Sequence, residues 1–238
     1  IAHGSDVRDP HRHIEINGKW SMYLAGDAEW RADLARAARL HRAVAESSGR
    51  PVFYSTPDLR LDLEGGTWLP VCLDVNAWGT DAPLLERAQP RVLHIPSKRT
   101  PPIKGTQFVD PVLRKLDDAG KIEYVCPESV PHSAMRSLVH DVDIVVDQLL
   151  AGSYGVAAIE AMSAGRVTVG RLAPPVLDLM PEAPPIVQAT PDELEETIVA
   201  VVEDRDHYRR LGREGINFAH IWHSGKASAT ALRGYLER

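Results

Sequence analysis

Residues 143–169 read DIVVDQLLAGSYGVAAIEAMSAGRVTV: an apolar run, a loop with two glycines, a helical segment and a second apolar run. The runs 143–147 and 166–169 are typical of strands buried on both faces, and residues 155–164 are typical of a helix that connects them. Two parallel strands joined by a helix form a βαβ unit, the building block of α/β folds. The stretch therefore predicts a parallel sheet covered by helices.

The same alternation continues on both sides of this stretch. Downstream of residue 90 we expect strands at 91–95 and 121–126, helices at 104–119 and 131–139, and further helices at 191–203, at 206–214 and through the C-terminus. Upstream we expect a strand end at 1–5, a polar loop through residue 17, a helix at 27–48 capped by Asp27, and short strands at 51–55 and 67–71. The proline pairs at 174–175 and 184–185 indicate loops.

The composition is that of an ordinary globular protein, with 238 residues, 44% hydrophobic and 25% charged, and a net charge of -6. This charge argues against a nucleic-acid partner, and the absence of a long apolar run argues against a membrane-spanning helix. Cys72 and Cys126 lack the spacing of a metal or redox site and fit a reduced, cytoplasmic setting. Because the chain opens inside an apolar run without an initiator Met, we expect that upstream sequence is missing.

Two loops follow predicted strand ends and carry groups that suit phosphate. The loop after residue 95 supplies the cations Lys98, Arg99 and Lys104, and the loop after Asp147 supplies a glycine-lined helix start. In doubly wound sheets ligands bind beyond the carboxyl ends of the strands. Cationic side chains and free helix N-terminal amides stabilise phosphate charge without a metal. The alternative is that these are solvated loop charges and a simple turn.

Glu160 is the only charged residue in the apolar helical segment 156–162. Carboxylates are seldom fully buried without a partner, so some donor must meet it. Ribose hydroxyls, about one and a half turns from the phosphate-binding helix end, would satisfy it. A structural alternative is that Glu160 pairs with an arginine or reaches solvent.

Four segments carry recognisable motifs: residues 3–6 read HGSD, residues 69–74 LPVCLD, residues 99–105 RTPPIKG and residues 152–165 GSYGVAAIEAMSAG. In this order they resemble the motifs of GT-B retaining glycosyltransferases of family 4, the group 1 glycosyl transferases. The family signature reads Glu, seven residues, Glu-Ala-Met-Ala-x-Gly, and its diphosphate clamp reads Arg-x-x-x-x-Lys-Gly. The resemblance implies two Rossmann-like domains that face each other across a cleft.

The resemblance also implies roles for particular residues. Arg99 and Lys104 would bind the diphosphate, Glu160 the ribose, and His3 would lie near the transferred sugar. The remaining donor contacts would be backbone amides of Gly155 and Val156, and a sugar pocket lined by Gly152, Ser153 and Tyr154. Ser133, at the start of the helix predicted after residue 130, is a candidate contact to the nucleobase. No metal and no cofactor are expected beyond the nucleotide diphosphate sugar itself.

Two departures from the family pattern stand out. The first Glu of the signature falls at Gly152, which puts the sugar or the catalytic competence in question; Asp147 and Gln148 are candidate substitutes. The N-terminal part is also short. We therefore expect residues 1–88 to be a partial N-terminal domain with the interdomain segment, 89–217 to be the nucleotide-sugar-binding domain, and 218–238 to be a helix that packs back on the N-terminal domain.

Three other histidines have two interpretations each. His11 and His13, near Asp6 and Asp9, form either a solvated loop or part of a metal site. His94 lies at a strand end, where it either faces the cleft or is a core histidine with both nitrogens hydrogen-bonded.

These observations favour an enzyme that transfers a hexosyl group from a nucleotide diphosphate sugar to an acceptor with retention of configuration. The alternatives are a truncated or degenerate module that binds the nucleotide sugar without turnover, and a nucleotide-sugar epimerase of the same fold. An oxidoreductase is disfavoured because no Gly-x-Gly-x-x-Gly follows a strand. The acceptor is not identified.

Overall fold

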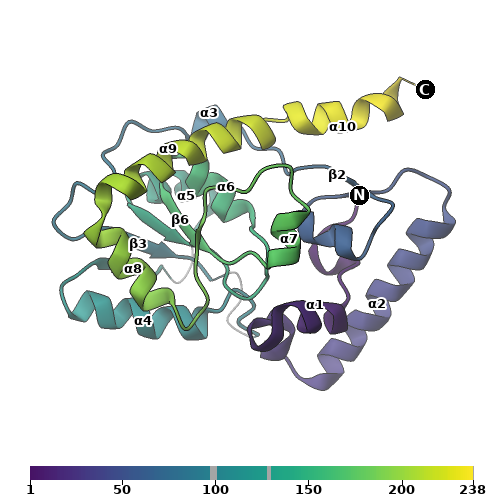
Figure 1. Ribbon diagram of the computed structural model, residues 1–238, viewed down its shortest axis with the longest axis horizontal. Helices are drawn as coiled ribbons and strands as arrows, with labels where there is room; N and C mark the ends of the chain where they lie inside the picture. The colour runs from purple at the N-terminus through teal and green to yellow at the C-terminus, as the bar shows by residue number, and fades with distance from the viewer. Residues whose placement is uncertain (97–100, 128–129, 238) are drawn as a thin grey trace.

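The computed structural model describes residues 1–96, 101–127 and 130–237 (Figure 1). Within these residues a five-stranded parallel sheet has the order β4-β3-β5-β6-β7. Its strands are β3 (Arg91–His94), β4 (Glu123–Val125), β5 (Ile144–Val146), β6 (Val167–Gly170) and β7 (Val187–Gln188). The α/β prediction is confirmed, although the two-residue β7 was not expected.

Helices cover both faces of this sheet, as alternating strand residues require. Val92 and Val146 pack with α4 (Thr106–Asp118) and α8 (Leu194–Glu203) on one face. Leu93 and Val145 point the other way and pack with α5 (His132–His140) and α6 (Val156–Ser163). Helix α9 (Arg205–Trp222) then packs on the outer side of α6 through Phe218.

The strand order reverses between β3 and β5, because the chain runs outward from β3 to β4 and then returns to β5. In such a sheet the loops after these two strands part and leave a crevice where ligands bind. The loops are the two that the sequence singled out, after residue 95 and after Asp147. The fold therefore brings the predicted cation and the predicted glycine-lined helix start to one place.

The N-terminal region is built from α1 (Pro10–Asn17), α2 (Ala28–Ser47), β1 (Phe53–Tyr54), β2 (Thr67–Trp68) and α3 (Val75–Trp78). The prediction of a polar loop through residue 17 is wrong, because α1 forms there. Asp9 starts this helix by accepting a hydrogen bond from His11 N–H at 2.8 Å, and Pro10 suits the first helical position. Helix α2 is confirmed, with Asp27 accepting from Trp30 N–H at 2.8 Å.

Two boundaries near the C-terminus also differ from the prediction. Pro174 and Pro175 open a short helix, α7 (Pro174–Asp178), rather than a loop, since proline suits the first helical positions. Helix α9 continues to Trp222, and a separate α10 (Lys226–Leu236) begins after Gly225, whose φ is +93°.

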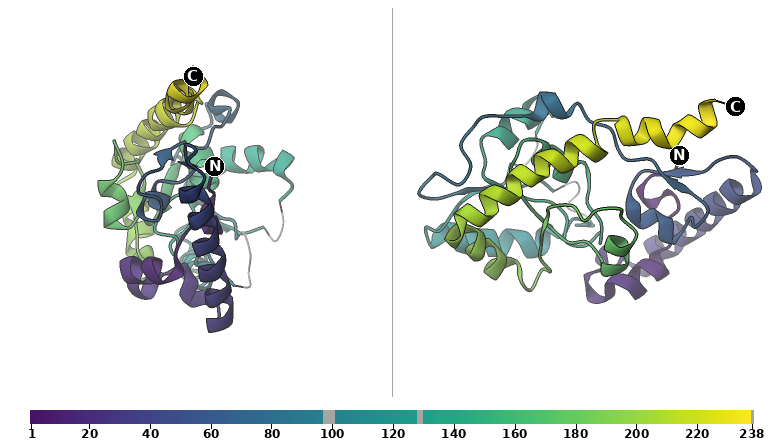
Figure 2. Two further views of the ribbon diagram at one scale, coloured as in Figure 1. Left: turned by 90° about the vertical axis from the view of Figure 1, so that its right-hand side faces the viewer. Right: turned by 45° about the horizontal axis from the view of Figure 1, so that its top comes forward.

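Helix α10 extends from α9 toward the N-terminal region (Figures 1 and 2). The Tyr235 ring lies edge-on to Phe53 of β1, with 6.3 Å between centroids, and the Ser228 hydroxyl donates to Pro70 O at 2.6 Å. These contacts fit the expected packing of the final helix on the N-terminal part, while the division at residues 88 and 217 stays a prediction.

Two buried histidines form hydrogen bonds that connect the N-terminal region to the part of the chain that contains the sheet. His13 Nε2 donates to Ala151 O at 2.9 Å and its Nδ1 accepts from the Ser21 hydroxyl at 2.7 Å. His223 Nδ1 donates to Val71 O at 2.8 Å and its Nε2 accepts from the Tyr154 hydroxyl at 3.0 Å. Both imidazoles are therefore neutral, and burial lowers the pKa of each to about 4.

We predict that acidification from pH 6.5 to pH 4 destabilises the fold. The unfolded chain protonates these imidazoles near pH 6.5, whereas the folded chain does so only near pH 4. The contribution of these neutral imidazoles to the free energy of unfolding is thus fully present above pH 6.5. It is lost as the pH falls toward 4, by up to about 3 kcal/mol for each histidine. Urea unfolding at several pH values measures this slope, and the double variant His13→Gln/His223→Gln should flatten it. An unchanged slope in that variant contradicts the assignment.

Candidate functional site

The candidate site lies where the segment before α4 meets the segment after β5. Lys104 Nζ, just before α4, is 3.0 Å from Asp147 Oδ1. The amide of Gly155, the N-cap of α6, donates to Asp147 Oδ2 at 3.1 Å. The Asp147 side chain is only 2% exposed. The ammonium group and the helix N-terminal amide therefore converge on one carboxylate, and Asp147 occupies the place between them.

Glu160 lies on α6, one and a half turns further along the helix. The residue is 5% exposed, and its carboxylate makes no hydrogen bond or ion pair with any residue of the described ranges. Burial raises its pKa above the usual range; Lys104 and His132 oppose this rise and Asp147 adds to it. The Glu160 oxygens are not among the fully buried, unpartnered side-chain atoms of the described residues, so the carboxylate keeps contact with solvent close to Lys104 and Asp147.

The remaining clamp and cleft residues are placed as follows. Arg99 lies outside the described residues. Ser133 is the second residue of α5 and is exposed. Its neighbour His132 lowers the pKa of Glu160 electrostatically. Val156 opens α6 with its side chain 47% exposed. His3 is exposed in the N-terminal region, where its amide donates to Asp6 Oδ2 at 3.0 Å; among the described residues nothing bonds it to Lys104 or Glu160.

The predicted sugar pocket is not open in this structure. Ser153 is 1% exposed, and Tyr154 is 4% exposed, with its ring against Phe218 and His223. Tyr154 therefore belongs to the core beneath α9 rather than to a pocket wall. His94 is likewise a core residue with both nitrogens bonded, Nδ1 to Val146 O and Nε2 to the Thr106 hydroxyl, each at 2.9 Å.

Gly152 is held by geometry that excludes a side chain. Its φ is +63°, and a Cβ there would lie 2.3 Å from Oδ1 of Asn17. Asn17 Oδ1 in turn accepts from Arg171 Nη1 at 2.8 Å. The space that a glutamate at position 152 would enter is thus taken by an asparagine–arginine pair. Gln148, a suggested substitute for that glutamate, instead donates to Ser153 O at 2.7 Å. No local sequence pattern predicts the Asn17–Arg171 pair.

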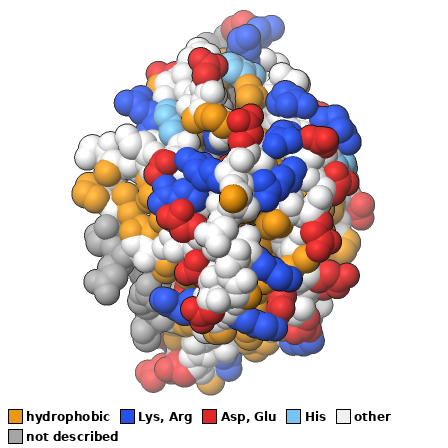
Figure 3. All heavy atoms as spheres, turned by 90° about the vertical axis from the view of Figure 1, so that its left-hand side faces the viewer, with side chains coloured by type: hydrophobic (Ala, Val, Ile, Leu, Met, Phe, Trp, Pro, Cys, Tyr) orange, Lys and Arg blue, Asp and Glu red, His pale blue; other side chains and the backbone are white. Residues whose placement is uncertain are grey.

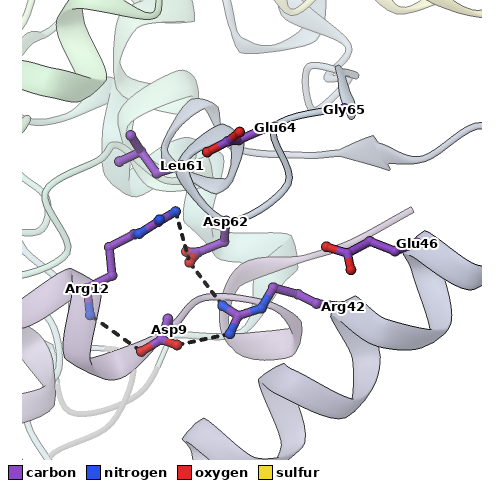
Figure 4. Close-up of a pocket in the computed structure, with 8 residues that line it drawn as sticks. All are labelled: Asp9, Arg12, Arg42, Glu46, Leu61, Asp62, Glu64 and Gly65. Carbon is purple, nitrogen blue, oxygen red and sulfur yellow. Dashed lines mark hydrogen bonds and ion pairs between the residues drawn. The ribbon is translucent and has the colours of Figure 1, made fainter.

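A hollow of about 340 Å³ lies on the N-terminal region (Figure 4). Six charged side chains, one leucine and one glycine line it: Asp9, Arg12, Arg42, Glu46, Leu61, Asp62, Glu64 and Gly65. Arg42 lies 2.9 Å from Asp9 Oδ2 and 3.0 Å from Asp62 Oδ1, and Arg12 lies 3.9 Å from Asp62. Because these charges neutralise one another, the network serves chiefly to hold the N-terminal region together.

We predict that Arg42→Met destabilises the protein by about 2 kcal/mol, because the nearly buried Asp62 carboxylate loses its main partner. Burial already raises the pKa of Asp62. Thermal and urea unfolding measure the effect, with Arg36→Met as control, since the Arg36 pair with Asp33 is exposed. Equal stability of the two variants would show that the network adds nothing.

Metal-binding side chains do not cluster in the described part of the chain. Within it no group of three His, Cys, Asp or Glu side chains could hold a metal. His13 is neither of the predicted alternatives, since it is buried and hydrogen-bonded to Ser21 and Ala151. On the face shown in Figure 3, basic and acidic side chains are interspersed. No helix in the described part of the chain is long and apolar enough to cross a membrane.

Comparisons with known proteins identify the fold. No protein-family model matches the chain, and no curated protein matches it significantly. Among solved structures, sucrose-phosphate synthase from Thermosynechococcus elongatus superposes with a TM-score of 0.65 at 14% identity, over 97% of this chain and 66% of that one. Alr3699/HepE of Anabaena, solved with UDP, gives 0.57 at 14% identity, over 99% of this chain and 71% of that one.

A third structure, TarM of S. aureus in complex with fondaparinux, α-GlcNAc-glycerol and UDP, gives a TM-score of 0.57 at 14% identity, over 85% of this chain and 46% of that one. Identities this low demonstrate a shared fold and not a shared activity. The fold is therefore that of the GT-B glycosyltransferases, as the sequence predicted.

Proposed function

We propose that this chain binds the donor of a retaining, family 4-like glycosyltransferase, which transfers a hexosyl group from a nucleotide diphosphate sugar to an acceptor. The observation that carries the proposal is the convergence of Lys104 and the Gly155 amide on one anion, beside a buried Glu160 that has no donor among the described residues. Diphosphate suits the first pair and ribose hydroxyls suit Glu160. Both parts belong to one ligand.

The chemistry follows from these groups. When the bond between the anomeric carbon and the diphosphate breaks, negative charge grows on the leaving oxygen. Lys104 and the amides of Gly155 and Val156 would stabilise that charge, and Arg99 would add a second cation. In a reaction with retention on the front face, the leaving phosphate takes the proton of the acceptor hydroxyl. The proposal assigns no metal and no protein nucleophile to this step.

The nucleoside would lie along α6 toward α5. The Glu160 carboxylate would accept hydrogen bonds from the ribose hydroxyls, and Ser133 or the backbone at the start of α5 would contact the base. This placement is supported by the electrostatic effect of His132, at the start of α5, on the pKa of Glu160. His3 would meet the sugar only if the N-terminal region brings it to the cleft.

A binding module without turnover is the second candidate. The observations that favour it are Asp147, which already neutralises Lys104, and the burial of Ser153 and Tyr154 where the sugar is expected. An epimerase of the same fold is the third. Incubation with a nucleotide sugar distinguishes the three candidates. Sugar transfer or donor hydrolysis indicates a transferase, and a changed configuration at one carbon of the sugar indicates an epimerase. Binding without any reaction indicates a binding module.

We predict that one of UDP, GDP and ADP binds this chain and that Glu160→Ala weakens that binding by about 1.5–3 kcal/mol, the range for hydrogen bonds to a charged group. Calorimetric titration measures the affinity. Glu214→Ala is the matched control, because Glu214 is exposed on α9. The proposal fails if none of the three nucleotides binds, and Glu160 is structural if both variants bind alike.

A further prediction concerns Asp147, whose carboxylate holds the groups that the diphosphate needs. Asp147→Asn removes a competing negative charge and should tighten nucleoside diphosphate binding by about 1 kcal/mol, or roughly fivefold. Asp178→Asn, at an exposed position on α7, should leave the affinity unchanged. Weaker binding by Asp147→Asn would instead mean that Asp147 orients Lys104 toward the phosphate.

A further inference from the structure

Arg171 lies at the same carboxyl edge of the sheet as the proposed donor site. It directly follows β6, and its amide donates to Gln148 O at 3.2 Å. The Gln148 side chain donates to Ser153 O at 2.7 Å, in the loop that leads into α6. Two hydrogen bonds therefore connect the Arg171 backbone to the loop that ends at the anion-binding Gly155 amide.

The Arg171 guanidinium is only partly exposed and has a neutral partner. Nη1 donates to Asn17 Oδ1 at 2.8 Å, and no carboxylate of the described residues pairs with it. Other buried guanidinium groups are compensated: Arg8 lies 2.6 Å from Asp58, and Arg166 donates to four backbone carbonyls. Burial accordingly lowers the pKa of Arg171 with no acidic group to offset it. Arg171 therefore carries a positive charge with no acidic partner among the described residues.

Residues far apart in the sequence build the surroundings of Arg171. Asn17 comes from α1 of the N-terminal region and meets Arg171 across 154 residues of sequence. Gly152, at φ +63°, gives Asn17 the room to do so, because any Cβ would collide with it. The N-terminal region and the sheet therefore both contribute to holding one cation beside the glycine-rich loop.

We propose that Arg171, oriented by Asn17, binds a carboxylate or phosphate carried by a sugar that lies next to the diphosphate, so that the chain selects an anionic sugar. The inference rests on the proposed donor site, since a sugar attached to a diphosphate at Gly155 lies beside this loop. A guanidinium presents a planar pair of donors that matches carboxylate and phosphate oxygens. The anion belongs either to the donor sugar, as in a uronic acid, or to the acceptor, as in a sugar phosphate.

Calorimetry on the whole chain tests this in two arms, after the titrations above have identified the nucleotide. The donor arm compares the glucose and glucuronic acid diphosphate esters of that nucleoside. The acceptor arm titrates glucose 6-phosphate and glucose into the complex with the nucleoside diphosphate. Each arm uses the wild type, Arg171→Gln, the orienting variant Asn17→Ala, and Arg210→Gln as control, because Arg210 is exposed on α9.

We expect the wild type to prefer the anionic ligand at least tenfold in one arm, and that arm names the source of the anion. Arg171→Gln should abolish the preference without changing the affinity for the nucleoside diphosphate, Asn17→Ala should reduce it, and Arg210→Gln should keep it. Equal affinity for anionic and neutral sugars in both arms overturns the inference while leaving the donor site intact. If no nucleoside diphosphate binds, the proposed donor site is wrong. In that case, glucose 6-phosphate binding by the wild type that is lost in Arg171→Gln would still support an anion site at Arg171. No binding of glucose 6-phosphate would overturn the anion site as well.

Discussion

The contact on which the candidate site depends is the one between Asp147 and two hydrogen-bond donors, the Lys104 ammonium and the Gly155 amide, at distances of 3.0 and 3.1 Å. It exists because the strand order reverses between β3 and β5, which places the ends of both loops in one crevice. The buried Asp147 carboxylate requires these two donors, because an unpaired buried charge strongly destabilises a protein. The same groups would accept a diphosphate, and the internal carboxylate then becomes its competitor.

The N-terminal region is joined to the carboxyl edge of the sheet through several independent contacts. His13 bonds to Ala151 O, the Met22 amide donates to Leu150 O at 2.9 Å, and Asn17 bonds to Arg171. Each contact reaches the loop before α6 or the end of β6. The protein groups that bind the nucleotide would therefore come from the sheet and its helices alone, whereas the surroundings of the sugar depend on both parts of the chain. A change in the N-terminal region should alter sugar recognition more than nucleotide recognition.

Much of the sheet, and the approach of Lys104 to Gly155 at its edge, could be predicted from the sequence, because the signals are local. Apolar runs identified β3, β5 and β6, the cap at Asp27 identified α2, and the loops at strand ends placed Lys104 near Gly155. The failures have physical causes. Helix α1 carries few apolar residues and depends on the Asp9 cap, and β7 has only two residues. The pairing of Asn17 with Arg171, and the burial of Tyr154 against α9, are long-range contacts with no local pattern.

If the start of α6 and Lys104 bind the diphosphate of a nucleotide, the amide resonances of these residues should respond to it. A ¹⁵N-labelled sample titrated with UDP, GDP and ADP shows this response residue by residue. We predict that one nucleotide shifts Gly155 and Val156 strongly, while residues around Arg42 in the hollow of Figure 4 stay unchanged. Shifts confined to that hollow, or none with any nucleotide, would contradict this prediction.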